Sequence, residues 1–511
     1  MKPTAGTTTS VWIASTNAPV KTVLEDDLTA DVCIIGAGIA GLTTAYLLAR
    51  AGRSVIVLDD GPIGGGMTAR TTAHLSNALD DRYYELERLF GEEGSRLAAE
   101  SHTQAIDCIE RIVSDEEIDC EFERVEGFLF AQDDESPQVL DDELPAAHRA
   151  GLVQVKRVDR SPLDFFNTGP CLSFPRQGQF HPLKYLNGLV AAIERDGGKI
   201  FTSTHADEIT GGEQAQVTTT GGYKISVQSI VVATNCPVND LVTIHTKQAP
   251  YLTYVIGARV PRGSVPSILL WDAPADIDRP YHYIRVARNE EHDVLVVGGE
   301  DHKTGQARDG LARWDRLEQW ARFRFPMIEG IEFRWSGQVM ETFDGLAFIG
   351  RNPGDDDNVF IATGDSGMGI THGTIAGMLI RDLILGRENP WAELYDPSRK
   401  TPAAVKDYLK ENINVAAQYT DVLTPGDVET ADEIGKDSGA VLRQGLSKLA
   451  VYRDADGLIH SMSAVCRHLG CIVNWNAVEK TWDCPCHGSR YDALGTVNNG
   501  PANSDLPPEP I

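Results

Sequence analysis

Four cysteines and two histidines lie between positions 466 and 487, in the segments CRHLGC and CPCHGS. Thiolates and imidazoles are ligands of zinc and of iron–sulfur clusters, so the spacings C-x-H and C-x-x-H predict two halves of one metal site. Tetrahedral zinc and a [2Fe–2S] cluster with two cysteines on one iron and two histidines on the other both fit such a ligand set. The expected ligands are Cys466, His468, Cys484 and His487.

A second candidate site lies near the N-terminus, where Gly36, Gly38 and Gly41 form the pattern G-x-G-x-x-G. An apolar segment precedes the glycines, and a segment with apolar residues at helical spacing and a second apolar segment follow, which predicts a β-α-β unit. There the first glycine makes the tight turn, the second lets the backbone approach a pyrophosphate, and the third allows close packing of the helix. Asp59 ends the second strand, where a carboxylate can bind ribose hydroxyls. We therefore predict one bound dinucleotide, FAD or NAD.

The C-terminal segments CRHLGC and CPCHGSRYD closely resemble the Rieske domain of the cytochrome bc complexes. The resemblance favours the [2Fe–2S] cluster over zinc, with Cys466 and Cys484 on one iron and His468 and His487 on the other. It also implies that the two histidines are exposed and form the exit for electrons. A ring-hydroxylating oxygenase would need a second pair of closely spaced histidines for mononuclear iron, and the sequence offers no convincing pair.

The same resemblance implies roles for four neighbouring residues. Cys471 and Cys486 are expected to form a disulfide that clamps the two loops over the cluster. Ser489 and Tyr491 are expected to donate hydrogen bonds to the cluster or to a ligand sulfur, which stabilises the reduced cluster and raises its potential. The remaining cysteines are expected to be small buried apolar groups: Cys33, Cys108, Cys120, Cys171 and Cys236.

The segments IIGAGIAGLTTAYLLARAGRSVIVLDDG, IVVATN, METFDGLAFIG and IATGDSGMGITHG, as a set, resemble the FAD-dependent amine oxidoreductases related to D-amino acid oxidase, glycine oxidase and sarcosine oxidase. The resemblance implies FAD as the dinucleotide. It places residues 68–75 beside the flavin and residues 364–370 by its pyrimidine end, where backbone N–H groups stabilise the anionic reduced flavin. The residues expected to bind the cofactor are Gly36, Gly38, Ile39, Ala40, Gly41, Asp59, Asp60, Thr68, Arg70, Thr72, Ala73, His74, Leu75, Ala233, Thr234, Gly364, Gly367, Met368, Gly369 and Ile370.

Catalytic candidates follow from the same family. His74 and His372 are expected to hydrogen-bond to the flavin or the substrate, although either can be a structural histidine. We do not expect covalent flavin at His74, because it does not align with the attachment histidines of relatives. Relatives clamp a substrate carboxylate with arginine and tyrosine, yet tyrosines in strands also simply pack and an arginine can form a structural ion pair. The candidates for the clamp are Tyr251, Tyr254, Tyr283, Arg285 and Arg70.

For the first part of the chain we predict an α/β Rossmann-like FAD-binding domain with an interleaved α+β substrate domain on a mixed or antiparallel sheet. An all-β Rieske domain is expected to follow it. Strands are expected at 32–35 and 54–58. The expected boundaries are an N-terminal extension at 1–29, the oxidoreductase at 30–388 (FAD-binding parts at about 30–115, 180–240 and 341–388; substrate parts at about 116–179 and 241–340), a connector at 389–425 and the Rieske domain at 426–511.

The composition narrows the range of partners. The net charge of −28 argues against nucleic acid and anionic membrane surfaces, and its plainest reading is solubility. No apolar run reaches the roughly 18 residues of a membrane span. The N-terminal segment shows no secretory pattern, so we expect a cytoplasmic protein.

These observations lead to one functional hypothesis and two alternatives. The first is a dehydrogenase that oxidises a small amine or amino acid by hydride transfer to FAD and passes electrons singly through the cluster to an external acceptor, such as a quinone or a small redox protein. The second reverses the flow, so that the cluster feeds FAD for substrate reduction. The third is a redox sensor or electron-transfer module without a substrate.

Overall fold

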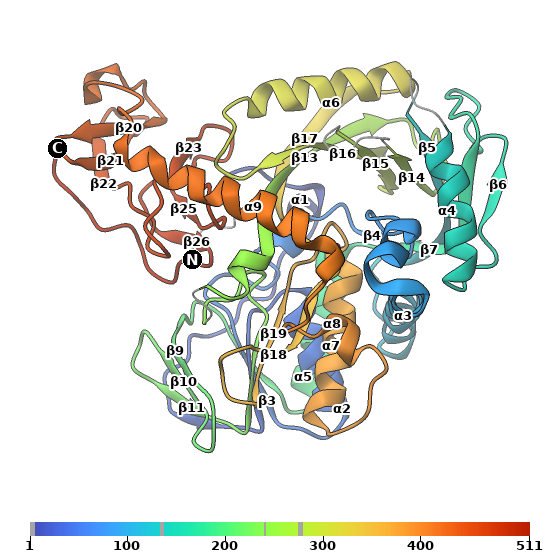
Figure 1. Cartoon of the computed structure of the whole chain (residues 1–511), viewed down its shortest axis with the longest axis horizontal. Helices are drawn as coiled ribbons and strands as arrows, with labels where there is room; N and C mark the ends of the chain where they lie inside the picture. The colour runs from blue at the N-terminus through green and yellow to red at the C-terminus, as the bar shows by residue number, and fades with distance from the viewer. Residues whose placement is uncertain (1–5, 133–136, 240–241, 274–279) are drawn as a thin grey trace.

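The computed structural model of the chain has three parts (Figure 1). A six-stranded sheet with its helices lies at the bottom of the view, a larger sheet lies above it, and a small β domain at the left carries the C-terminus. This is the predicted architecture. The structure describes residues 6–132, 137–239, 242–273 and 280–511.

The six-stranded sheet has the order β18-β19-β12-β2-β3-β8 and is parallel except for the edge pair β18–β19. All residues of β2, β3 and β19 are buried, as expected for apolar strands covered by helices on both faces. The predicted strand–helix–strand unit at the glycine motif is confirmed. The elements are β2 (Val32–Ile35), α2 (Ile39–Arg50), β3 (Val55–Leu58), α5 (Pro182–Arg195), β8 (Lys199–Phe201), β12 (Ser229–Val232), β18 (Phe348–Arg351), β19 (Val359–Thr363) and α7 (Gly369–Ile384).

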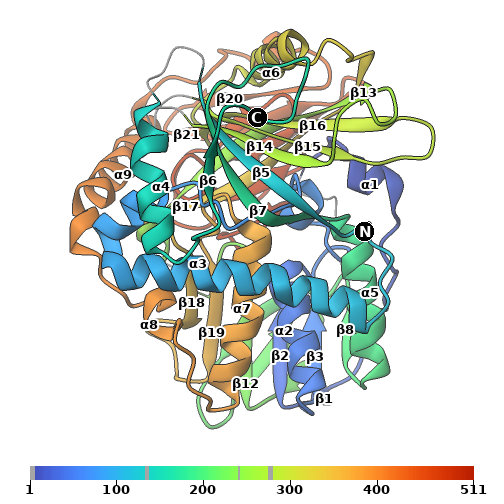
Figure 2. The same ribbon diagram turned by 90° about the vertical axis from the view of Figure 1, so that its right-hand side faces the viewer.

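The larger sheet is mixed, with the order β17-β13-β16-β15-β14-β5-β7-β4 and β6 paired to β7. The long helix α3 (Tyr83–Asp115) crosses the boundary between this sheet and the parallel one (Figure 2). The other elements are β4 (His74–Leu75), β5 (Glu123–Ala131), α4 (Gln138–Arg149), β6 (Lys156–Val158), β7 (Cys171–Gln179), β13 (Gln248–Val260), β14 (Ile268–Ala273), β15 (His282–Ala287), β16 (Asp293–Lys303), α6 (Gly310–Arg324) and β17 (Gly330–Thr342).

The segment before the first parallel strand is built into the oxidoreductase. Trp12 is buried and donates from its indole nitrogen to the carbonyl of Thr71, 2.7 Å away. Ser10 donates to the carbonyl of Ala69 at 2.6 Å, so this segment supports the turn that carries Arg70. The elements here are α1 (Val11–Ser15), the turn η1 (Met67–Arg70), and the small sheet of β1 (Leu28–Thr29), β9 (Ala206–Thr210), β10 (Gln216–Thr219) and β11 (Lys224–Ser226).

The C-terminal domain consists of two antiparallel sheets, as the alternating pattern predicts. Trp482 is fully buried and packs against Trp475 with ring centroids 4.9 Å apart. Its elements are η5 (Ala431–Glu433), β20 (Ser438–Gln444), β21 (Ser447–Arg453), β22 (Ile459–Ser463), β23 (Asn474–Asn476), β24 (Thr481–Asp483), β25 (Arg490–Asp492) and β26 (Val497–Asn499).

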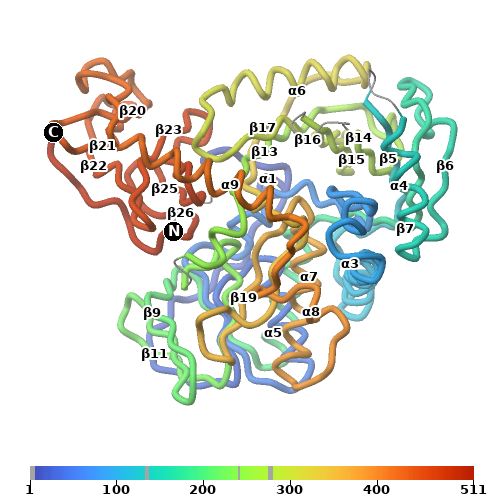
Figure 3. Tube along the Cα trace, in the orientation of Figure 1, coloured from blue at the N-terminus to red at the C-terminus, as the bar shows by residue number. Residues whose placement is uncertain are grey.

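A helical segment joins the oxidoreductase part to the C-terminal β domain and runs from the parallel sheet to that domain (Figure 3). Its main helix α9 (Val405–Gln418) has no fully buried residue but is tied to the larger sheet by an ion pair of Glu411 with Lys303 at 2.5 Å. The other elements are α8 (Ala392–Tyr395), η3 (Pro402–Ala404) and η4 (Tyr419–Leu423). Among the described residues, no helix is both long and apolar enough to span a membrane.

Candidate functional site

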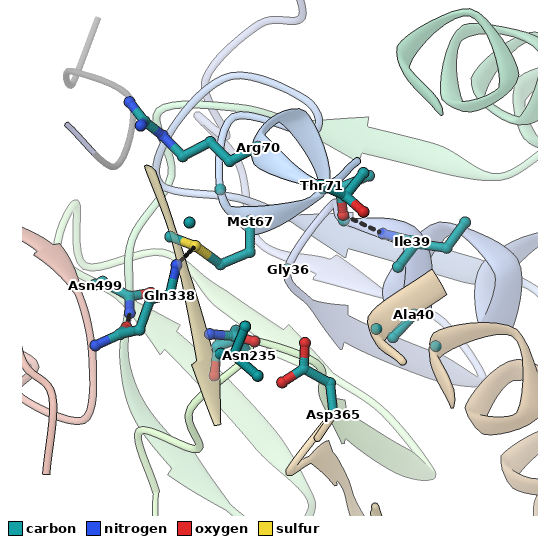
Figure 4. A pocket seen from close by; sticks show the side chains of 18 of the residues that line it. Gly36, Ile39, Ala40, Met67, Arg70, Thr71, Asn235, Gln338, Asp365 and Asn499 are labelled. Atoms are coloured by element: carbon teal, nitrogen blue, oxygen red, sulfur yellow. Dashed lines mark hydrogen bonds between the residues drawn. The ribbon is translucent and has the colours of Figure 1, made fainter. Parts of the chain in front are cut away.

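A cavity of about 310 Å³ opens at the carboxyl ends of β2 and β3, passes the start of α2 and extends to the larger sheet. Residues 497–500, 502 and 503 of the C-terminal domain form part of its wall, and the amide of Asn499 hydrogen-bonds that of Gln338 there (Figure 4). Gly41, Ala73, Leu75 and Gly364 do not line it. The predicted cofactor residues that line it are Gly36, Gly38, Ile39, Ala40, Asp59, Asp60, Thr68, Arg70, Thr72, His74, Ala233, Thr234, Gly367, Met368, Gly369 and Ile370.

The glycine motif forms a cradle at the start of α2. Gly36 has a φ of +109°, and a Cβ there would overlap the carbonyl oxygen of Ala233. A Cβ on Gly41 would overlap the carbonyl oxygen of Gly36, so the third glycine serves helix packing. Gly38 faces the cavity, where a Cβ would come 3.2 Å from the hydroxyl of Thr68. The exposed backbone at a helix N-terminus suits the pyrophosphate of a dinucleotide.

Asp59 holds the loops around the cradle. One of its carboxylate oxygens accepts the N–H of Ala37 at 2.7 Å, and the other accepts the N–H of Gly61 at 2.8 Å. Each carboxylate oxygen can accept more than one hydrogen bond, so ribose hydroxyls can still bind.

His74 lies on β4 at the wall of the cavity. Its Nδ1 is 3.0 Å from the hydroxyl of Thr72 and its Nε2 is 3.2 Å from the carbonyl oxygen of Ile284. Burial, followed by the charge of Arg285, lowers the pKa of His74 to about 3, so the ring is neutral. A neutral ring held at both nitrogens fits a shaping or hydrogen-bonding role and not that of a general base.

Three of the predicted catalytic residues lie behind the wall. The Nη1 of Arg285 donates to the carbonyls of Ala73 at 2.8 Å and Phe180 at 3.0 Å, and this supports Ala73 at its φ of +59°. The hydroxyl of Tyr254 lies 3.0 Å from Nε2 of His302. The Nδ1 of His372 lies 2.9 Å from the carbonyl oxygen of Asp365, so His372 braces the loop that does line the cavity.

Tyr283 does reach the cavity, together with residues that the sequence did not single out. Its hydroxyl bonds that of Thr253 at 2.5 Å. The wall residues at the end formed by the larger sheet that no sequence motif marked are two acids and two aromatic residues: Asp80, Asp301, Trp271 and Tyr281. Asp365 also lines the cavity and lies in the segment 364–370 that the family resemblance placed beside the flavin.

The C-terminal cluster residues converge as a donor set for two irons. The rings of His468 and His487 have centroids 4.8 Å apart, and Cys466 and Cys484 are both buried. The two thiols share a hydrogen bond, which lowers the pKa of Cys466 and raises that of Cys484. Two cysteine sulfurs this close together suit a pair of ligands on one iron.

The predicted disulfide between Cys471 and Cys486 is present, with its Cα atoms 6.5 Å apart. Its sulfurs lie within 4.8 Å of that of Cys484, so the disulfide borders the cluster site. The hydroxyl of Tyr491 lies 3.3 Å from the sulfur of Cys466. The hydroxyl of Ser489 accepts the N–H of Ala502 at 3.0 Å.

The expectation that the two cluster histidines are exposed is wrong. His487 is only 6% exposed and His468 is half-buried. His245, in η2 (His245–Lys247) of the oxidoreductase, covers both rings, with centroid distances of 4.8 Å to His468 and 6.2 Å to His487. The domain interface buries them, and a reading of the isolated domain could not foresee this contact.

An ion pair also closes the interface. Arg70, which lines the cavity, also pairs with Glu479 of the C-terminal domain at 3.1 Å, and both side chains are fully buried. Glu479 also accepts from the hydroxyls of Ser336 at 2.5 Å and Thr8 at 2.6 Å. Figure 4 shows the guanidinium of Arg70 turned away from Asp365. The charge of Arg70 is therefore compensated within the protein.

Residues 31–383 match the family FAD dependent oxidoreductase, and residues 415–510 match the Rieske [2Fe-2S] domain. The chain belongs to the FAD dependent oxidoreductase family and carries a Rieske domain at its C-terminal end. It is an FAD-dependent oxidoreductase whose cofactors are FAD and a [2Fe–2S] cluster, as the resemblance implied.

Similar proteins share one or both parts. The chain is 32% identical over 500 residues to the putative Rieske 2Fe-2S iron-sulfur protein YhfW of Bacillus subtilis (strain 168), covering 97% of this chain and 96% of that protein. It is 27% identical to gamma-glutamylputrescine oxidoreductase of Escherichia coli (strain K12), over 77% of this chain and 92% of the relative. Glycine oxidase from Geobacillus kaustophilus shares the fold, with a TM-score of 0.59 at 18% identity over 73% of this chain and 99% of the other.

Proposed function

We propose that this protein is a dehydrogenase of a small amine whose electrons leave singly through the Rieske cluster to an external acceptor, such as a quinone or a small redox protein. When bound, FAD supplies a two-electron hydride acceptor and the cluster a one-electron carrier. The substrate carbon next to nitrogen loses a hydride and the nitrogen loses a proton, so the amine becomes an imine. Water then hydrolyses the imine to a carbonyl compound and releases the nitrogen as ammonia or an amine.

The amine substrate is supported by relatives and by the cavity. The relative from Escherichia coli is named for an amine, and it aligns over most of the oxidoreductase part. At the end of the cavity formed by the larger sheet, His74 and Tyr283 supply neutral polar groups beside Trp271. Such a wall can orient an amine while the reacting carbon faces the flavin.

The contact of His245 with the cluster histidines carries the electron-transfer proposal. His245 is buried, and its Nδ1 lies 3.6 Å from the sulfur of Cys236. Cys236 closely follows Ala233 and Thr234, which line the cavity. His245 and Cys236 therefore lie between the wall of the FAD cavity and the cluster ligands inside one chain, and electrons need no diffusing carrier between the two cofactors.

Electrons are proposed to leave at the outer side of the loop that carries Cys466 and His468. Val465 is 40% exposed and Leu469 is 37% exposed, and they flank the ligands Cys466 and His468. Arg467 between them is also exposed. This small apolar surface with one cation lies within a few residues of the cluster and gives an acceptor a place to dock.

The test uses the purified holoprotein without oxygen. A panel of amines and amino acids is added while flavin absorbance and the low-temperature EPR signal of the cluster are recorded. Flavin bleaching followed by the signal of the reduced cluster supports the proposal. Flavin bleaching by a reduced carrier, and by no amine, would show that electrons flow from the cluster to FAD. Bleaching by an amine without cluster reduction would separate the cluster from the reaction.

A further inference from the structure

The acidic wall of the cavity identifies a class of substrate. We propose that the substrate is a cationic amine without a carboxylate next to the reacting nitrogen, of the alkyl diamine or polyamine type, held by Asp301 and its neighbours on this wall. This inference rests on the proposed amine oxidation. It distinguishes the protein from enzymes that clamp an α-amino acid by its carboxylate.

Three carboxyl groups from distant segments meet at this end of the cavity. Asp80 precedes α3, Asp301 lies on β16 and Asp365 follows β19, and all three line the cavity. Glu341 on β17 lies close enough that Asp80, Asp301 and Asp365 all act on its charge. The wall therefore carries carboxyl groups from three separate segments, and Glu341 lies near them without lining the cavity.

These carboxyl groups have few counter-charges. Burial is the main cause that raises the pKa of Asp301 to about 7 and that of Asp365 to about 6, and it also raises the pKa of Asp80. The Oδ1 atom of Asp301 is buried and has no hydrogen-bond partner among the described residues. A buried carboxylate oxygen without a hydrogen bond is costly, even though Thr253 hydrogen-bonds to the same carboxyl group, and a bound ammonium group would relieve that cost.

Aromatic rings provide an independent indication of a cation. Trp271, Tyr281 and Tyr283 line the same end of the cavity, and the rings of the two tyrosines have centroids 5.5 Å apart. The faces of aromatic rings attract ammonium groups, most strongly where water is excluded. A wall of carboxylates and aromatic rings suits an alkylammonium ion.

The wall lacks what an α-carboxylate needs. Among the described residues, Arg70 is the only lysine or arginine that lines the cavity, and its charge is paired with Glu479. Arg285 lies behind the wall and donates to backbone carbonyls. A carboxylate at this end would face Asp80 and Asp301 without a cation to offset the repulsion.

The test measures binding and oxidation separately in the holoprotein. Tetramethylammonium is the binding probe, because it carries the charge but has no N–H and cannot form an imine. Its dissociation constant is measured from the change in flavin absorbance. Asp301→Asn is expected to weaken binding about tenfold or more, a change of about 1.4 kcal/mol. The control Asp164→Asn removes the same charge from a side chain that is 98% exposed and should bind as wild type.

Oxidation is then compared for 1,4-diaminobutane, glycine and proline at matched concentrations. Bleaching by the diamine alone supports the inference, and bleaching by the amino acids alone overturns it while amine oxidation stands. If tetramethylammonium binds in an Asp301-dependent manner but no amine bleaches the flavin, the cation site stands and the proposed function falls. Equal binding by wild type and Asp301→Asn overturns the cation site.

Discussion

The imidazole of His245 and that of the cluster ligand His468 have ring centroids 4.8 Å apart and planes 78° apart. The two residues belong to different domains, so the oxidoreductase part supplies the surface on which the cluster edge rests. In the proposed function, this contact makes the domain interface a part of the electron path as well as a link between the domains.

We expect His245→Ala to slow reduction of the cluster after an amine is added by about tenfold or more, because electron transfer depends on the packing between the sites. Flavin bleaching should keep its wild-type rate, since His245 does not line the FAD cavity. Rapid mixing with freeze-quench EPR measures both steps. His292→Ala, which removes a histidine bonded to Glu332 far along the larger sheet, is the control. Unchanged cluster reduction in His245→Ala would contradict a role for this contact.

Breaking the buried pair of Arg70 and Glu479 should destabilise the interface. Glu479→Gln leaves the buried guanidinium without its counter-charge, at a cost of about 3–5 kcal/mol in the free energy of unfolding. The double variant Arg70→Met/Glu479→Met should recover most of that loss, because no charge remains buried. Urea denaturation of the three proteins checks this, and a Glu479→Gln protein as stable as wild type would refute it.

The affinity for tetramethylammonium should rise with pH through about pH 7, because the raised pKa of Asp301 keeps its carboxyl neutral below that value. Thr253, Asp80, Arg313 and His282 also act on this group. The free energy of unfolding should change in the opposite sense and fall as the pH rises. Between the unfolded and the folded pKa, the Asp301 carboxyl keeps a proton in the folded state that the unfolded chain has lost. This contribution to stability is lost as the pH rises through the folded pKa. Binding titrations across this range check the trend, and Asp301→Asn should reduce it.

Tyr491→Phe should lower the reduction potential of the cluster. The hydroxyl lies 3.3 Å from the sulfur of Cys466, and a hydrogen bond there favours the more negative reduced state. Losing about 1 kcal/mol of that preference corresponds to roughly 40 mV for one electron. A potentiometric titration followed by EPR measures the shift. A potential equal to that of wild type would show that this hydroxyl does not tune the cluster.

Much of the fold could be predicted from local patterns, and the family resemblances supplied the identity of both cofactors. The glycine motif between two apolar segments predicted β2, α2 and β3, because turn, helix and strand preferences act over a few residues. The disulfide partners Cys471 and Cys486 followed from the family resemblance and are joined in the structure. Arg285 and Tyr254 could not be placed, because an arginine or tyrosine in a strand looks the same whether it faces a cavity or packs behind it.

Short segments of the sequence predicted a metal site, a dinucleotide site and the order of the domains, because ligand spacing and the glycine turn are local properties. The family resemblances then chose the iron–sulfur cluster over zinc and FAD over NAD. What surrounds these segments depends on tertiary packing. This packing paired Arg70 with Glu479 across 409 positions, placed His245 over the cluster histidines and brought Asp80, Asp301 and Asp365 to one wall. These contacts join segments far apart in the chain. They arise from how the sheets and domains pack, and no local pattern encodes that packing.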